Sequence, residues 1–144
     1  MKRFFAIFLS LLLIGMVTSW VIRLLFPSDR EAILRLIEKG REAIEEEDMK
    51  TLSEILSLDY LDAWGHNYHR LLSLFRRNFQ VYDDIRVFLP FRKVAVEKPF
   101  AKCSLYVRIS GKERSYGEEL IYASPLVIYL IKENSKWYVI SASE

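Results

Sequence analysis

The chain has 144 residues, which is enough for one domain of ordinary size but not for two. Hydrophobic residues make up 51% of it and charged residues 28%, which excludes a disordered chain and a collagen-like one. A single cysteine excludes a disulfide-stabilised scaffold and a zinc ribbon built from cysteines.

The net charge of +2 averages two unlike parts of the chain. Residues 1–26 hold three basic side chains and no acidic one. Residues 27–144 hold 18 basic and 19 acidic side chains, so their net charge is −1. Because nucleic-acid binding requires a basic surface, we expect no nucleic-acid partner for a domain that is close to neutral.

The N-terminal segment predicts a membrane anchor. Phe4 to Ile22 is a run of 19 residues without a charge, and Trp20 has the position of an interfacial aromatic anchor. At about 1.5 Å per residue, a helix of this length just crosses a hydrocarbon core of roughly 30 Å. A cleaved signal peptide is the alternative, because Lys2 and Arg3 precede the run.

The charges before the run predict its orientation. By the positive-inside rule, Lys2 and Arg3 keep the N-terminus in the cytoplasm, so the domain faces the outside. We therefore expect a single-pass protein of the bacterial inner membrane with its domain in the periplasm. Residues 1–26 are the anchor (or signal peptide), with lipid contacts through residues 4–26, and residues 27–144 are the domain.

Three helices are predicted after the apolar run. Ser28 and Glu31 form a capping box at the start of the first, which has a helical apolar period over about 18 residues. Asp48 is the expected N-cap of a short second helix. The third helix is expected from about Asn67 to Phe79, and the stretch from Asp59 to Gly65 is predicted to be a loop.

After the third helix the hydrophobic period changes from 3.6 to 2, which predicts a sheet. About five strands are expected, with approximate ranges 85–89, 94–96, 101–110, 126–131 and 137–141. The alternation is clearest in Ala101–Ser110, where Cys103 and Leu105 point to one face and Tyr106 and Arg108 to the other. Helices followed by an antiparallel sheet make an α+β fold.

Three stretches of the domain carry a resemblance to a known family. They are Ala43 to Asp48 followed by Leu52, Ile55 and Leu56; Asp59, Tyr60, Asp62 and Gly65; and Lys136 to Ile140. They resemble, in that order, the first two helices, the entry to the third helix and the closing strand of the nuclear transport factor 2-like superfamily, a cystatin-like cone shared by ketosteroid isomerases and SnoaL-like polyketide cyclases. The resemblance covers about residues 29–144 and implies three helices packed on a curved antiparallel sheet.

The resemblance implies a pocket between the helices and the concave sheet face. Enzymes of the superfamily direct acids and bases into this pocket, but the predicted inward rows of the first helix and of strand 101–110 hold no tyrosine or carboxylic acid. Isomerase-type chemistry is therefore not expected, and no cofactor is predicted. The predicted pocket residues are Tyr60, Trp64, Phe75, Phe79 and Leu105.

Polar residues gather between Asp59 and His69. No catalytic residue is assigned, and Asp59 and Asp62 are the candidates for a general base at the pocket mouth. His66 and His69 are three residues apart, so on a helix they could bind a metal together with Asp62. A polar entrance to the third helix is the simpler interpretation, and we predict no metal.

The outer face of the sheet is the candidate interface. Tyr106 and Arg108 are predicted to point outward, beside an apolar row formed by Val127, Tyr129 and Ile131. Such a face would expose a sizeable apolar patch if nothing covered it. The resemblance also implies a dimer or partner surface here.

Two functions are compatible with these features. The first is a membrane-anchored, extracytoplasmic and non-enzymatic binding or assembly module, which contacts a protein partner or a second copy through its sheet. The alternative is a domain that binds an apolar small ligand in the pocket, with isomerase or hydrolase activity as one form of it. An inward carboxylate in an open cavity would favour the alternative, whereas a cavity filled by aromatic side chains would favour the first.

Overall fold

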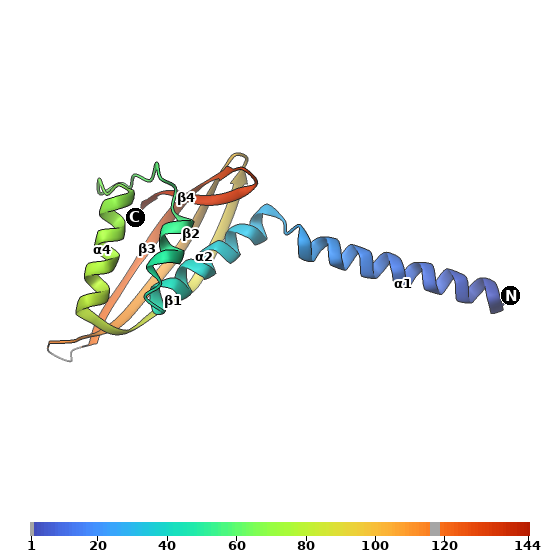
Figure 1. Cartoon of the computed structure of the whole chain (residues 1–144), viewed down its shortest axis with the longest axis horizontal. Helices are drawn as coiled ribbons and strands as arrows, with labels where there is room; N and C mark the ends of the chain where they lie inside the picture. The colour runs from blue at the N-terminus through green and yellow to red at the C-terminus, as the bar shows by residue number, and fades with distance from the viewer. Residues whose placement is uncertain (1, 116–118) are drawn as a thin grey trace.

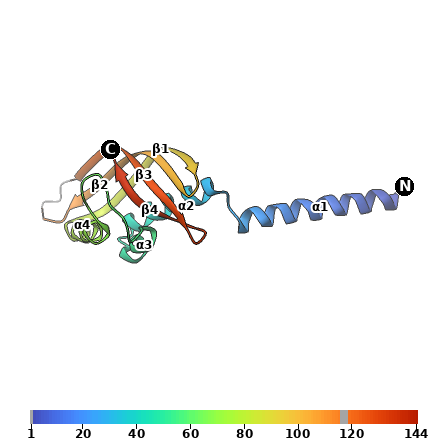
Figure 2. The ribbon, with the colours of Figure 1, turned by 90° about the horizontal axis from the view of Figure 1, so that it is seen from above.

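The computed structural model describes residues 2–115 and 119–144, and in that part of the chain four helices precede four strands. The helices are α1 (Lys2–Leu25), α2 (Asp29–Glu45), α3 (Met49–Ile55) and α4 (Tyr68–Val81). The strands are β1 (Tyr82–Glu97), β2 (Phe100–Glu113), β3 (Glu119–Glu133) and β4 (Lys136–Ser143). Figures 1 and 2 show α2, α3 and α4 on one face of the sheet, while α1 projects away from the domain. The α+β fold is as predicted.

The sheet is an antiparallel meander in the order β1-β2-β3-β4, so the prediction of five strands was wrong for the described residues. The expected strands 85–89 and 94–96 are parts of one continuous strand, β1. Pro90 lies between them, and its missing N–H is tolerated because β1 is an edge strand. The pairing with β2 shifts register between Phe88 and Phe91, so the strand continues through the proline.

The predicted starts of the three domain helices are confirmed by their caps. The side chains of Ser28, Asp48 and Asn67 each accept a hydrogen bond from the backbone N–H three residues later, at 3.3, 3.1 and 3.0 Å. These bonds satisfy donors that the first turn of a helix leaves without a partner. The local sequence signal for each helix therefore agrees with the packed structure.

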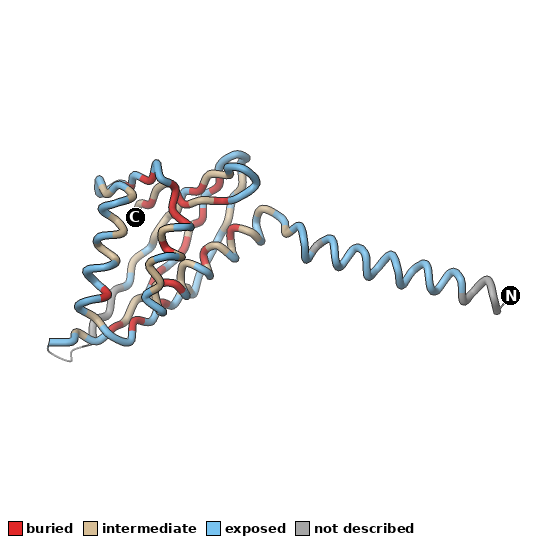
Figure 3. Tube along the Cα trace, in the orientation of Figure 1, coloured by how far each residue is buried: buried red, intermediate tan, exposed pale blue. Residues whose placement is uncertain are grey.

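The core lies between the helices and the inner face of the sheet, where Figure 3 shows the buried residues. The buried hydrophobic residues of β2 are Ala101, Cys103, Leu105 and Val107. They alternate with less buried neighbours, as expected for a strand with one face against a core. In β3, Leu130 is completely buried, whereas Tyr129 next to it is 37% exposed on the outer face.

Charged side chains hold α2 against β1. Arg41 donates to Glu38 and Glu45, with N–O distances of 2.6 Å in both cases. Glu38 also accepts from Arg92 of β1 at 2.9 Å, and Glu45 accepts from the backbone N–H of Val87 at 2.8 Å. Two of these bonds, from Arg92 and from the N–H of Val87, join α2 directly to β1.

Asp29, the first residue of α2, joins this helix to two hairpins of the sheet, β1–β2 and β3–β4. Its carboxylate accepts from Lys132 Nζ at 2.6 Å and from Trp137 Nε1 at 3.0 Å, and it pairs with Lys98 Nζ at 2.7 Å. The hydrogen bond from Lys132, followed by that from Lys98, holds the pKa of Asp29 well below its usual range.

α1 is a helix of 24 residues, and its described large apolar side chains are between 43% and 68% exposed. Within the described part of the chain, we find no helix that is both long and apolar enough to cross a membrane. The predicted span from Phe4 to Ile22 is therefore not confirmed. The side chains of residues 4–6, which belong to that span, lie outside the described ones.

We expect Asp29→Asn to lower the free energy of unfolding by about 1–2 kcal/mol at pH 7, because three donors lose their charged acceptor. The folded-state pKa is depressed, so this stabilisation is present above the unfolded pKa of about 3.9 and is lost as the pH falls toward the folded value. Urea unfolding of wild type and variant at pH 7 and pH 3 measures the difference.

The exposed Asp59 provides the control, since Asp59→Asn should change stability by less than about 0.5 kcal/mol. An Asp29→Asn effect as large at pH 3 as at pH 7 would contradict the role of the ionised carboxylate.

Candidate functional site

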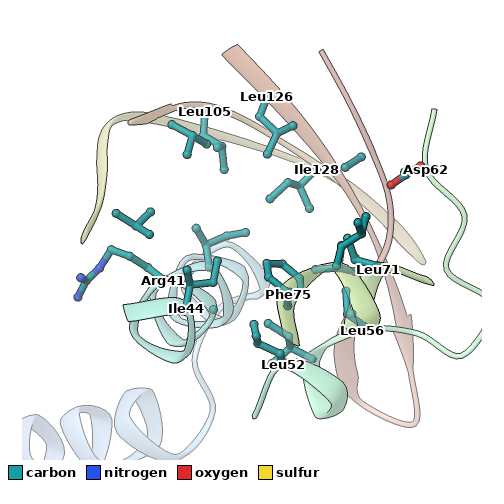
Figure 4. A pocket seen from close by; sticks show the side chains of 18 of the residues that line it. Arg41, Ile44, Leu52, Leu56, Asp62, Leu71, Phe75, Leu105, Leu126 and Ile128 are labelled. Atoms are coloured by element: carbon teal, nitrogen blue, oxygen red, sulfur yellow. The ribbon is translucent and has the colours of Figure 1, made fainter. Parts of the chain in front are cut away.

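A cavity of about 510 Å³ lies between the helices and the inner face of the sheet. Ligand sites for small molecules typically have volumes of roughly 300–1,000 Å³. In Figure 4, Leu105, Leu126 and Ile128 of the sheet form one wall, and Leu52 and Phe75 of the helices form the opposite wall. The surroundings of this space are therefore almost entirely hydrocarbon.

Four of the five predicted pocket residues line this cavity, but they do not fill it. Tyr60, Trp64, Phe75 and Leu105 line its wall. Phe79 is not among the lining residues and is buried in the core, with its ring stacked on that of Phe75 at a centroid distance of 6.1 Å. The aromatic side chains of α4 thus pack on each other and leave the space beside them open.

Close packing of α2 on α3 forms the floor of the cavity. Gly40 of α2 lines the cavity, and a Cβ added there would lie 3.1 Å from Cδ1 of Ile55 in α3. Glycine therefore allows the two helices to approach each other. α3 in turn leads directly into the segment that carries the polar residues of the site.

The segment between α3 and α4, residues 56–67, runs along the edge of β4 that does not pair with β3. The N–H groups of Ser57, Leu61 and Ala63 donate to carbonyl oxygens of β4 at 2.9, 3.0 and 3.0 Å. Tyr60 and Asp62 are buried, while Leu61 and Ala63 are exposed, so alternate residues point in opposite directions. The sequence predicts only a loop here, because the segment lacks the β-branched residues that indicate a strand.

Asp62 is the carboxylate that this segment turns inward, and its side chain is only 2% exposed. Oδ1 accepts from the backbone N–H groups of Trp64 at 3.0 Å and His66 at 2.8 Å. Oδ2 accepts from the Tyr60 hydroxyl at 3.2 Å and lies 2.9 Å from Nδ1 of His66. Figure 4 shows the carboxylate at one end of the cavity.

Asp62 is ionised. Burial acts to raise its pKa, but the hydrogen bonds from the N–H and ring of His66 and from the N–H of Trp64 outweigh burial, so the pKa lies below its ordinary value. An ionised carboxylate only accepts hydrogen bonds, so Nδ1 of His66 carries the proton that lies between them. Burial and the nearby charge of Asp62 raise the pKa of Tyr60, whose hydroxyl therefore remains a donor.

His66 completes the polar end of the cavity. It belongs to the lining, and its side chain is 23% exposed. Nδ1 faces Asp62, and no described residue forms a hydrogen bond with Nε2. The sequence offered one signal for this pair, the spacing of four residues between Asp62 and His66, but that spacing is common and carried no weight in the prediction.

Asp59 and His69 do not join the site. Asp59 is exposed, and His69 is exposed with its ring edge-on to that of Tyr68 at a centroid distance of 5.2 Å. His66 precedes the N-cap Asn67 and so lies outside the helix, which is why the spacing of the two histidines does not bring their rings together. Among the described residues no group of histidine, cysteine, aspartate and glutamate is arranged to hold a metal ion.

The outer face of the sheet is aromatic, and no described element covers it. Strand pairing places the five predicted interface residues there: Tyr106, Arg108, Val127, Tyr129 and Ile131. The aromatic residues exposed on this face are Phe88, Phe91, Phe100, Tyr106 and Tyr129. The ammonium of Lys102 lies 6.0 Å from the ring centre of Tyr129, which is a cation–π distance.

No protein-family model matches the chain, and no curated protein matches its sequence. Solved structures do match its fold. A conserved protein from Planctomyces limnophilus has 19% identity and a TM-score of 0.75, over 81% of this chain and 94% of that one. A nuclear transport factor 2-like superfamily protein from Salmonella enterica has 12% identity and a TM-score of 0.69, over 78% and 86%.

A third similar structure, from Nostoc punctiforme, is a protein of unknown function with a cystatin-like fold. It has 16% identity and a TM-score of 0.65, over 81% of this chain and 90% of that one. Likenesses at this level of identity show the fold alone. The chain has the nuclear transport factor 2-like, or cystatin-like, fold that the resemblance implied, and the fold assigns no activity.

We expect Asp62→Ala to lower the free energy of unfolding by about 2–4 kcal/mol, because it leaves two backbone N–H groups and the Tyr60 hydroxyl without their acceptor. Urea unfolding measures this loss. Asp59→Ala is the matched control on the exposed side of the same segment, with an expected change below about 0.5 kcal/mol. A loss for Asp62→Ala no larger than that of the control would contradict the structural role of the carboxylate.

Proposed function

We propose that the domain binds a small, largely apolar molecule in the cavity between the sheet and α2, α3 and α4. The observation that carries this proposal is an open space of about 510 Å³ with hydrocarbon walls and one polar end. A domain that acts only through its outer surface gains nothing from such a space. The inward carboxylate of Asp62 also favours the small-molecule function, because a domain that acts only through its outer surface has no use for a polar group at the cavity.

The energetics of an apolar cavity support a ligand. Side chains around an unfilled space lose van der Waals contacts on one side, which costs stability. A hydrocarbon ligand restores those contacts and removes apolar surface from water, at about 25 cal/mol for each Å² buried. The affinity would therefore come mainly from the walls, and the polar end would select among ligands of similar size.

Binding is proposed here rather than a reaction. Ketosteroid isomerases need a hydrogen-bond donor that faces the developing oxyanion. The hydroxyl of Tyr60 donates to the Asp62 carboxylate at 3.2 Å and is not free for a ligand. The guanidinium of Arg41 points away from the cavity toward its partners Glu38 and Glu45 (Figure 4).

We also propose that α1 attaches the domain to a membrane, with residues 1–26 as the anchor and residues 27–144 as the domain. The uncharged run from Phe4 to Ile22 and the exposure of the described apolar side chains of α1 support this attachment. With Lys2 and Arg3 on the cytoplasmic side, the domain would lie in the periplasm of a bacterial cell.

Self-association through the outer sheet face is a second proposed function. Exposed aromatic rings from β1, β2 and β3 share this face, and aromatic residues are enriched in the centres of protein interfaces. A second copy of the chain would cover the rings of both partners with one symmetric contact. This function does not compete with ligand binding, because the cavity lies on the opposite face of the sheet.

Leu126→Trp tests the cavity. The larger side chain would occupy the space that Leu126 borders, so we expect at least a tenfold loss of affinity for an apolar probe such as 2-decalol. Isothermal titration calorimetry of the full chain in phosphatidylcholine nanodiscs, with empty nanodiscs subtracted, measures the affinity. Lys102→Trp adds the same side chain on the outer face and should bind like wild type. Equal affinities of all three proteins would sink the proposal.

Tyr129→Glu tests the outer face. A carboxylate placed in an apolar contact loses its hydration, so we expect the dimer to dissociate at concentrations at least tenfold higher than for wild type. Sedimentation of the full chain in a mild detergent measures this. Leu58→Glu changes an exposed apolar residue that is not part of the sheet and should leave the dimer intact. A wild-type chain that stays monomeric, or a Tyr129→Glu dimer of unchanged stability, would exclude this interface.

A further inference from the structure

We infer that the bound molecule is an alcohol, with a hydrocarbon body in the cavity and a hydroxyl group that donates a hydrogen bond to Nε2 of His66. Asp62 acts as a positioning residue, since it fixes the ring and the site of its proton. This inference rests on the proposed function, because it names the class of molecule that occupies the same cavity.

The hydrogen bonds of Asp62 decide which ring nitrogen of His66 can accept. Oδ1 receives two backbone N–H groups, and Oδ2 receives the Tyr60 hydroxyl and faces Nδ1 of His66 at 2.9 Å. Since Asp62 is ionised, Nδ1 is the donor in the last contact. In a neutral imidazole the other nitrogen then has a free lone pair, so Nε2 is an acceptor.

The ring is also held in place by the backbone. The N–H of Asp62 donates to the carbonyl oxygen of His66 at 3.1 Å, while the N–H of His66 donates to Oδ1 of Asp62 at 2.8 Å. With the ring bonded to the same carboxylate, His66 is fixed at three points. The imidazole of His66, a residue of the cavity lining, therefore has a defined position, as a specific binding site requires.

The charges at the cavity disfavour an anionic ligand. Among the described lining residues the other ionised side chain is Arg41, and it is paired with Glu38 and Glu45. A ligand carboxylate would lie beside Asp62 without a free cation to compensate it. Long-chain acids are therefore not the class of ligand that this site selects.

The number of hydrogen-bonding groups separates the remaining classes. An ammonium group would bring three donors to the acceptor at Nε2, and the donors left without an acceptor would cost free energy once buried. A ketone or an ether brings no donor and would leave Nε2 without a partner. A hydroxyl group has one hydrogen to donate, and Nε2 of His66 can accept it.

The test compares two bicyclic ligands of equal size, 2-decalol and 2-decalone, on the full chain in phosphatidylcholine nanodiscs. We expect the alcohol to bind about tenfold more tightly than the ketone, which corresponds to one hydrogen bond. His66→Phe should abolish this preference while the ketone still binds. His69→Phe is the matched control, because His69 is exposed outside the cavity, and it should keep the preference.

Asp62→Asn tests the positioning role of Asp62, because a purely structural role would leave the preference for the alcohol over the ketone unchanged. Two backbone N–H groups point to the place of Oδ1, so the amide oxygen stays there and the amide nitrogen takes the place of Oδ2. That nitrogen donates to Nδ1 of His66, and the ring proton moves to Nε2, which becomes a donor. We therefore expect Asp62→Asn to reverse the preference, with the ketone bound at least as tightly as the alcohol.

Each outcome has one meaning. If neither compound binds the wild-type chain, the proposed ligand function fails and the inference fails with it. If both bind equally and His66→Phe changes neither affinity, the cavity binds ligands but the inference is overturned. If Asp62→Asn keeps the wild-type preference, the positioning role of Asp62 is overturned. Should His66→Phe not fold, Asp62→Asn decides, since it retains both backbone bonds.

Discussion

The buried carboxylate of Asp62 is the interaction on which the candidate site depends. Removing a carboxylate from water costs several kcal/mol unless donors compensate it, and here two backbone N–H groups, a hydroxyl and an imidazole surround it. Those bonds close the chain from Tyr60 to His66 into a compact turn beside β4. The Asp62 carboxylate therefore holds the end wall of the cavity, the imidazole of His66 in that wall and the turn that leads into α4.

Successive side chains of each strand point to opposite faces of the sheet, so the cavity wall and the outer face are formed by different residues. In β3, Leu126 and Ile128 border the cavity, while Val127 and Tyr129 belong to the outer face. A ligand inside and a second chain outside would thus contact neighbouring residues of one strand without sharing any. Such an arrangement allows either surface to change in sequence while the other is retained, provided that the strand itself keeps its pairing.

The parts of the fold that depend on local signals could be predicted from the sequence, and the parts that depend on distant contacts could not. The caps at Ser28 and Asp48 mark helix starts with side chains that bond within four residues. The prediction of five strands was wrong because a proline such as Pro90 commonly ends a strand. Only the pairing of the residues on both sides of Pro90 with β2 shows that β1 continues. The resemblance implied a pocket at this place, but its open volume was not predictable, because side-chain sizes do not give the distance between elements. The bond between Asp62 and His66 also depends on a backbone shape that has no sequence signature.

The clamp at Asp29 has a mechanical consequence for the whole chain. Only three residues, 26–28, separate α1 from α2, and Asp29 follows them directly. Because its carboxylate is bonded to the β1–β2 and β3–β4 hairpins, we expect the start of α2 to move as one body with the sheet. We therefore expect backbone rotation in residues 26–28 to accommodate a change in the direction of α1. Because Asp29 is held to the sheet, we expect the distance between the cavity walls to be the same for every direction of α1.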